Sequence, residues 1–309
     1  MKLVFFGTPK FAIPSLTKIH NSRHEILAIV TSPDAKLGRG LKMKQLPIKI
    51  IGDELNYKIY QPSLLSDTSF IEKLKSINAD LFIVVAFKIL PRKIISLPNK
   101  GAINLHASLL PQYRGAAPIQ HAILNGEKQT GVTTFLIETK IDTGDILLQQ
   151  KYPILQDQIA GNVYTDLSII GAELLLKTID KLENNSLNSR KQDPANSSLA
   201  PAIKPLDCLI DWTKSSDEIH NQIRALSPLP GAYTFINKKR IKLFASKLSI
   251  NTILKKTKPG TLYNHANYLT VTTGKDDINI YEVQLEGKKR MPVKSFLSGF
   301  NINNINHFG

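Results

Sequence analysis

The first 183 residues alternate short apolar runs with longer amphipathic segments. The runs have the length of buried strands and cover residues 3–6, 26–31, 81–86, 103–105 and 132–137. Between and after them, apolar residues recur at helical spacing over residues 11–19, 71–77, 119–124 and 163–182. This alternation predicts a Rossmann-like α/β domain over residues 1–183, with a mostly parallel sheet and helices on both faces.

The pattern changes after residue 183. Residues 184–206 are rich in Asn, Ser and Pro, lack periodicity, and are predicted to form a linker. Beyond them, one short helix is expected over residues 216–226. Strand-like runs then cover residues 232–236, 241–244, 268–271 and 278–283, separated by Pro-Gly and Gly turn signals. We therefore expect residues 207–309 to form a small OB-like β-barrel.

Composition adds few constraints. Hydrophobic residues make up 42% and charged residues 21% of the 309 positions, as in ordinary globular proteins. The single cysteine, Cys208, excludes an internal disulfide framework and fits a reducing compartment. The first apolar run is too short for a signal peptide or a membrane span. These observations predict a cytoplasmic protein without membrane contact, and nothing in them requires more than a monomer.

The net charge of +15, from 40 basic and 25 acidic residues, favours an anionic partner such as nucleic acid. A Lys-rich composition that only solubilises the surface explains the total equally well. The distribution is more informative. Residues 1–205 carry 25 basic and 17 acidic side chains (net +8), whereas the shorter part from residue 206 onward carries 15 and 8 (net +7). The second domain is thus the more densely positive.

Two polar residues lie where an apolar run ends. Asn104 and His106 are two positions apart, so on a strand both side chains point to the same face. Ligands of α/β sheets bind at the carboxyl ends of strands. A carboxylate, Asp142, follows later in a Thr-Gly-Asp turn. The alternative is structural: a hydrogen-bonded core pair and an ordinary turn former.

If the three side chains meet, they suit acyl transfer to an amine without a covalent enzyme intermediate. Asn104 can donate a hydrogen bond to the oxyanion of the tetrahedral intermediate, and a protonated His106 can add a second. Asp142 would favour the imidazolium and could accept a proton. The chain's seven histidines and one cysteine show no ligand spacing, so no metal is expected.

A Gly-containing loop after the second predicted strand carries four cations. Lys36, Arg39, Lys42 and Lys44 could form an arm that contacts phosphates. An ordinary solvated loop has the same composition.

Three motifs together resemble the folate-dependent formyltransferases. They are Asn-x-His-x-Ser-Leu-Leu-Pro at residues 104–111, Arg-Gly-Ala-Ala-Pro at 114–118 and Asp-Thr-Gly-Asp at 142–145. Gly-Thr-Pro-Lys-Phe-Ala at 7–12, Gly-Arg-Gly at 38–40 and Ile-Asp-Trp at 210–212 extend the similarity over nearly the whole chain.

The resemblance implies formyl transfer from 10-formyltetrahydrofolate by Asn104, His106 and Asp142. It implies a folate site formed by Ser108, Leu109, Leu110 and Pro111 together with Phe87, Ile89 and Leu90. It also implies that the Arg39 loop and the basic second domain bind methionyl initiator tRNA as acceptor.

Two rival functions remain at this point. One is a formyltransferase acting on a small amine such as an amino sugar nucleotide, which would not need the Arg39 loop or the basic tail. The other is a non-enzymatic RNA-binding protein on the same scaffold, against which the intact Asn104, His106 and Asp142 argue.

Overall fold

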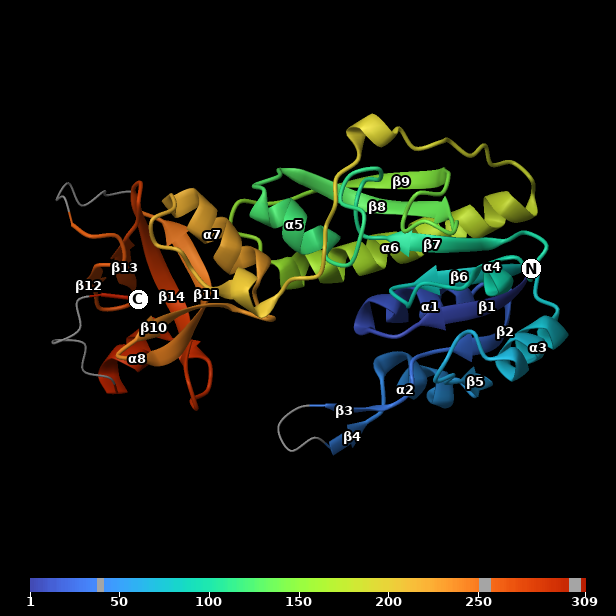
Figure 1. Ribbon diagram of the computed structural model, residues 1–309, viewed down its shortest axis with the longest axis horizontal. Helices are drawn as coiled ribbons and strands as arrows, with labels where there is room; N and C mark the ends of the chain where they lie inside the picture. The colour runs from blue at the N-terminus through green and yellow to red at the C-terminus, as the bar shows by residue number, and fades with distance from the viewer. Residues whose placement is uncertain (38–41, 250–256, 300–306) are drawn as a thin grey trace. The chain divides into compact units, whose positions relative to one another are not determined.

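The computed structural model describes residues 1–37, 42–249, 257–299 and 307–309. They form two compact units (Figure 1). The first unit contains residues 1–118, 130–152 and 164–200, and the second contains residues 119–129, 153–163 and 201–309. Each unit therefore takes its residues from several stretches of the chain.

A seven-stranded sheet forms the centre of the first unit. Its strand order is β5-β2-β1-β6-β7-β8-β9, with β8 antiparallel to β7 and the strands from β5 to β7 parallel. The strands are β1 (Lys2–Gly7), β2 (Glu25–Val30), β5 (Ile59–Tyr60), β6 (Leu81–Val85), β7 (Ala102–His106), β8 (Gln129–Leu136) and β9 (Ile146–Pro153). A separate hairpin pairs β3 (Ala35–Leu37) with β4 (Lys42–Lys44).

Helices cover both faces of this sheet because its central strands are apolar on both sides. All of β6 is buried, as is β1 after its first residue. On one face, Phe6 and Phe82 pack with Phe70 and Leu74 of helix α3 (Thr68–Ile77). On the other, helix α6 (Ala160–Glu183) approaches so closely at Gly171 that a Cβ there would lie 2.7 Å from the Leu105 side chain.

The helices of the chain are mostly short, and α6 is the exception at 24 residues. They are η1 (Lys10–Ala12), α1 (Ile13–His20), α2 (Pro47–Glu54), α3 (Thr68–Ile77), α4 (Arg92–Ile95), α5 (Pro118–Leu124), α6 (Ala160–Glu183), η2 (Pro194–Asn196), η3 (Pro205–Cys208), α7 (Ser216–Ala225) and α8 (Val293–Gly299). Within the described residues, no helix combines the length and the apolar character that crossing a membrane would need.

An antiparallel sheet forms the second unit, in the order β10-β11-β14-β13-β12, with β15 paired to β14. Its strands are β10 (Ala232–Ile236), β11 (Lys239–Leu248), β12 (Leu262–Asn264), β13 (Leu269–Thr272), β14 (Asp277–Leu285) and β15 (Met291–Pro292). Trp212 is buried in its core, where it stacks on Phe308 and donates a hydrogen bond from Nε1 to Thr234 Oγ1 at 3.1 Å.

Helix α7 of this unit begins with a capping box. Ser215 Oγ accepts a hydrogen bond from the Glu218 amide, and Glu218 Oε2 accepts one from the Ser215 amide. One turn further on, His220 is buried, its Nδ1 2.9 Å from Ser246 Oγ and its Nε2 3.2 Å from the carbonyl oxygen of Gln156. Burial lowers the pKa of His220 below its ordinary value.

The predicted fold class is confirmed: a Rossmann-like α/β unit is followed by an antiparallel β unit. Several elements were not predicted, among them the edge strands β5, β9 and β12. In β9, Gln149, Gln150 and Lys151 interrupt the apolar pattern because this strand lies at the edge of the sheet.

Candidate active site

Strand β7 places Asn104 and His106 at the carboxyl edge of the parallel strands. Asn104 lies opposite Val84 of β6, and Val85, which ends β6, lies opposite both Leu105 and Gly7 of β1. His106 therefore extends just past the ends of the parallel strands β6 and β1, while it still pairs with Thr133 of the antiparallel β8. Its neighbour Leu105 packs on the α6 side, so the alternation of the strand directs Asn104 and His106 to the other face.

His106 lies close to Asp142. The His106 Nδ1 atom lies 3.6 Å from Asp142 Oδ2, and both side chains are largely buried, with 7% and 12% of their surface exposed. The other ring nitrogen, Nε2, lies 2.9 Å from the carbonyl oxygen of Tyr113. A carbonyl oxygen only accepts, so Nε2 carries a hydrogen and Nδ1 is the atom left to exchange a proton with Asp142 or a substrate.

The turn that carries Asp142 is fixed by its backbone. Asp142 has a φ of +53°, in the left-handed region that is uncommon for a residue with a side chain. Two residues later, a Cβ at Gly144 would lie 1.7 Å from the carbonyl oxygen of Leu136, so only glycine fits. The Gly115 amide donates a hydrogen bond of 2.8 Å to Asp142 Oδ2 and so orients the carboxylate.

Asn104 is unusual in one atom of its side-chain amide. Its side-chain Oδ1 atom is buried and receives no hydrogen bond from the described residues. An unpaired buried acceptor costs about 1–3 kcal/mol, which a bound molecule with an N–H group would recover. This orphaned atom therefore favours a ligand site over a purely structural role for Asn104.

The loop after His106 is held by one buried hydroxyl. Thr133 Oγ1 donates to the carbonyl oxygen of Ser108 at 2.7 Å and accepts from the Leu110 amide at 3.1 Å. Gln149 Nε2 donates both to Thr133 Oγ1 at 3.0 Å and to the carbonyl oxygen of Leu110 at 2.8 Å. The loop conformation is thus set from β8 and β9.

Of the residues that the resemblance assigns to folate, several are structural in this unit. Ser108 is fully buried and donates to the carbonyl oxygen of Gln112, and Leu110 packs with Phe135 and Ile146. Leu90 belongs to the core, and the half-buried Phe87 packs edge-on against Phe6. Ile89, in contrast, is 67% exposed.

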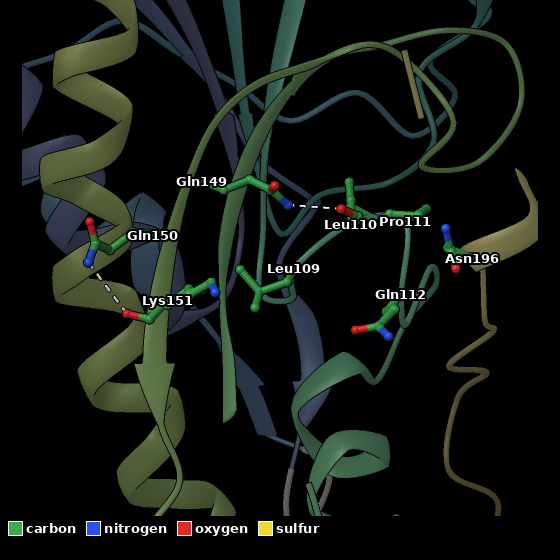
Figure 2. Close-up of a pocket in the computed structure, with 8 residues that line it drawn as sticks. All are labelled: Leu109, Leu110, Pro111, Gln112, Gln149, Gln150, Lys151 and Asn196. Carbon is green, nitrogen blue, oxygen red and sulfur yellow. Dashed lines mark hydrogen bonds between the residues drawn. The ribbon is translucent and has the colours of Figure 1, made fainter. Parts of the chain in front are cut away.

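A pocket of about 620 Å³ opens beside this loop (Figure 2). Leu109, Leu110 and Pro111 contribute apolar surface to it. Its other lining residues are polar: Gln112, Gln149, Gln150, Lys151 and Asn196. Figure 2 shows the hydrogen bond that joins Gln149 to Leu110 at its wall.

The expected cationic arm coincides in part with the β3–β4 hairpin. Lys36 is in β3, opposite Met43, and Lys42 and Lys44 are in β4. Arg39 lies outside the described residues.

One cluster of metal-ligand type occurs elsewhere in the first unit, formed by His24, Asp180 and Glu183. Arg23 already pairs with both carboxylates, at 3.0 Å from Asp180 and 2.6 Å from Glu183. Burial lowers the pKa of His24. This cluster therefore has the character of a structural ion-pair network.

The sequence did not reveal the groups that support Asn104, His106 and Asp142. The carbonyl of Tyr113 and the amide of Gly115 are backbone groups, which no residue type reveals. Gln192 bonds the Asp142 turn but lies in the Asn-, Ser- and Pro-rich segment that was predicted to be a linker. The Arg-Gly pair at positions 114–115, which follows the Asn-x-His-x-Ser-Leu-Leu-Pro motif, was the sequence feature that pointed to the Tyr113–Gly115 loop.

The fold is that of an α/β protein with a candidate Asn–His–carboxylate site at the carboxyl ends of the parallel strands of a Rossmann-like sheet. The formyl transferase model matches residues 1–179, and the model of the formyl transferase C-terminal domain matches residues 202–301. The chain belongs to the formyl transferase family. It is thus an enzyme and not a non-catalytic RNA-binding protein.

Named relatives are similar over almost the full length. The chain is 40% identical over 304 residues to the methionyl-tRNA formyltransferase of Citrifermentans bemidjiense, covering 98% of this chain and 94% of the relative. It is 42% identical over 305 residues to that of Clostridium novyi, covering 98% of each.

Solved structures are similar too. A sugar 3N-formyl transferase, WlaRD, solved in the presence of dTDP and 5-N-formyl-THF, has a TM-score of 0.69 at 25% identity, covering 94% of this chain and 99% of that one. A methionyl-tRNA formyltransferase from Clostridium thermocellum has a TM-score of 0.56 at 18% identity, covering 81% and 94%, which shows the shared fold. A folate co-substrate accords with family membership and with the folate-bound neighbour.

Proposed function

We propose that this enzyme transfers a formyl group from 10-formyltetrahydrofolate to the α-amino group of methionyl initiator tRNA. The observation that carries the chemistry is the approach of His106 Nδ1 to Asp142 Oδ2 at 3.6 Å, together with the unpaired Oδ1 atom of Asn104 on the same face of β7. The acceptor is supported by relatives about 40% identical over nearly the whole chain and named methionyl-tRNA formyltransferase.

In the proposed reaction, the amine attacks the formyl carbon and forms a tetrahedral intermediate. The new carbon–nitrogen bond creates an oxyanion, which the Asn104 amide and a protonated His106 stabilise by donating hydrogen bonds. The attacking nitrogen becomes positively charged, and Asp142 takes its proton directly or through water. Collapse of the intermediate breaks the bond to the folate nitrogen, which receives, directly or through water, the proton that Asp142 had taken from the amine. Asn104 Oδ1 suits the attacking amine, because it is an acceptor without a partner.

We propose that the folate lies near the loops that follow β6 and β7. In the first loop, the proposed neighbours are Phe87, Ile89 and Leu90. Ile89 is exposed, Phe87 is half-buried and Leu90 is buried. In the second, Ser108, Leu109, Leu110 and Pro111 are the proposed neighbours, and Leu109 and Pro111 are its half-buried members.

For the tRNA, we propose contacts from Lys36, Arg39, Lys42 and Lys44 and from the basic second unit. The phosphate backbone supplies salt-dependent affinity to such surfaces. Methionyl-tRNA formylation should therefore fall steeply between low and moderate ionic strength.

The test is a formylation assay with three acceptors: charged initiator tRNA, charged elongator methionyl-tRNA and free methionine. We expect formylation of the first only. Equal rates with free methionine would contradict the proposal.

A second candidate, formylation of an amino sugar nucleotide, is favoured by one observation. The sugar 3N-formyl transferase aligns with a TM-score of 0.69, against 0.56 for the solved methionyl-tRNA formyltransferase. Activity on such a nucleotide with a flat salt profile, and none on charged tRNA, would establish this candidate instead.

A further inference from the structure

Gln192 uses every hydrogen-bonding group of its side-chain amide to join two loops of the candidate active site. Its Oε1 accepts from Arg114 Nε at 3.1 Å and from Arg114 Nη2 at 2.8 Å. Its Nε2 donates to the carbonyl oxygens of Asp142 at 2.9 Å and Gly144 at 2.7 Å. A planar amide bonded at both ends fixes the distance between its partners.

The two loops are those that bring His106 and Asp142 together. Arg114 follows Tyr113, whose carbonyl oxygen accepts from His106 Nε2, and precedes Gly115, whose amide donates to Asp142. The Gly115–Asp142 bond and the Gln192 bridge are therefore parallel links between the same two loops.

The segment that carries Gln192 is anchored on both sides. Arg190 and Ile146 exchange two backbone hydrogen bonds of 2.8 Å. Further along, the Arg114 amide donates to the carbonyl oxygen of Ser198 at 2.9 Å, and the Ala200 amide donates to that of Arg114 at 2.7 Å. Gln192 lies between these anchors, so its amide is presented in a fixed orientation.

We propose that Gln192 is a positioning residue that holds Asp142 against His106. The proposal rests on the proposed function, in which Asp142 accepts the proton. The Asp142 turn needs such support because its backbone is held in the left-handed region at a φ of +53°. Misplacement of a reacting group by about 1 Å can cost a factor of about 100 in rate.

Two substitutions distinguish a role of Gln192 in positioning Asp142 from a role that only attaches residues 190–200 to the first unit. Gln192→Met keeps the length of the side chain and removes all four hydrogen bonds. Gln192→Glu keeps an acceptor for Arg114 but loses the donor to the carbonyls of Asp142 and Gly144. The matched control is Gln222→Met, because Gln222 of the second unit also donates to two carbonyl oxygens, those of Asp207 and Leu209.

The first measurement is steady-state formylation of methionyl-tRNA by the full chain. We expect both Gln192 variants to lower kcat by about 10- to 100-fold, with KM for folate and tRNA little changed and Gln222→Met like the wild type. In an Asp142→Asn background, Gln192→Met should cost almost nothing more, because its effect passes through Asp142. Wild-type kcat in either Gln192 variant, or an undiminished loss in the Asp142→Asn background, would overturn the proposal.

The second measurement does not depend on activity. Hydrogen exchange of the Gly115 amide reports the bond to Asp142 directly, and it should accelerate in Gln192→Met but not in Gln222→Met. Unchanged protection would refute the positioning role. A wild-type enzyme inactive on methionyl-tRNA would refute only the proposed function, since the exchange result still decides the role of Gln192.

Discussion

The hydroxyl of Thr133 gives the sharpest stability prediction, because it bonds two backbone groups of the loop after His106. Thr133 is fully buried, lies opposite His106 in the β7–β8 pair, and bonds Ser108, Leu110 and Gln149. Thr133→Val keeps the shape of the side chain and removes the hydroxyl.

The expected loss of stability depends on whether each hydrogen-bond partner of Thr133 keeps another partner. The buried Leu110 amide would be left unpaired, at about 1–3 kcal/mol, and the Ser108 carbonyl would lose a bond that contributes about 1 kcal/mol. Gln149 retains its bond to the carbonyl oxygen of Leu110. We therefore expect the free energy of unfolding to fall by about 2–4 kcal/mol. Turnover should fall as well, because Ser108 lies only two residues after His106.

Urea denaturation measures this loss, with Thr178→Val as the matched control. Thr178 is equally buried, but its hydroxyl bonds only the Thr134 hydroxyl and the carbonyl oxygen of Leu174 in its own helix. No backbone amide loses its partner there, so the control should cost about 1 kcal/mol. Equal losses in the two variants would refute the reasoning.

Three further predictions concern the site turn, the chemistry and the second unit. Asn104→Ala and His106→Ala should each lower kcat for formylation by about 100-fold or more if they stabilise the oxyanion, and normal turnover in both would exclude that mechanism. Gly144→Ala should give an inactive or poorly folding protein, because its Cβ would overlap a backbone carbonyl. The control is Gly299→Ala, whose Cβ would have nothing within 4 Å, and it should match the wild type in both activity and melting temperature. Burial lowers the pKa of His220, so the unfolded chain binds a proton more readily than the folded one, and stability falls as the pH drops below 6.5. In urea titrations across this range, His220→Gln should reduce that slope by up to about 1.4 kcal/mol per pH unit, and an unchanged slope would contradict the assignment.

The sequence predicted what depends on local periodicity. The two-residue spacing of Asn104 and His106 was enough to place them on one face at a strand end, because side chains alternate between the two faces of a strand. The alternating pattern likewise predicted the main strands of both units. Edge strands such as β9 were not predicted, because polar residues such as Gln149 and Lys151 are tolerated where a strand has only one neighbour.

The meeting of His106 with Asp142 could not be derived from spacing, because it depends on long-range loop contacts. The Gly115 amide, the Tyr113 carbonyl and the Gln192 side chain create it, and each comes from a segment without periodic pattern. Composition was misleading at Gln192 in particular. A segment rich in Asn, Ser and Pro has the appearance of a flexible connection, yet its residues 190–200 form fixed hydrogen bonds within the first unit.

Because of that anchored segment, the sheet and the bonds that support the Asp142 turn are completed at different points along the chain. A fragment ending at Glu183 would keep every strand of the seven-stranded sheet and all three proposed catalytic side chains. It would lack Gln192, Ser198 and Ala200, and with them the bonds to Arg114 and to the Asp142 turn. An insertion, a fusion joint or a recombination breakpoint that is to spare these bonds as well as the sheet should therefore be placed after residue 200.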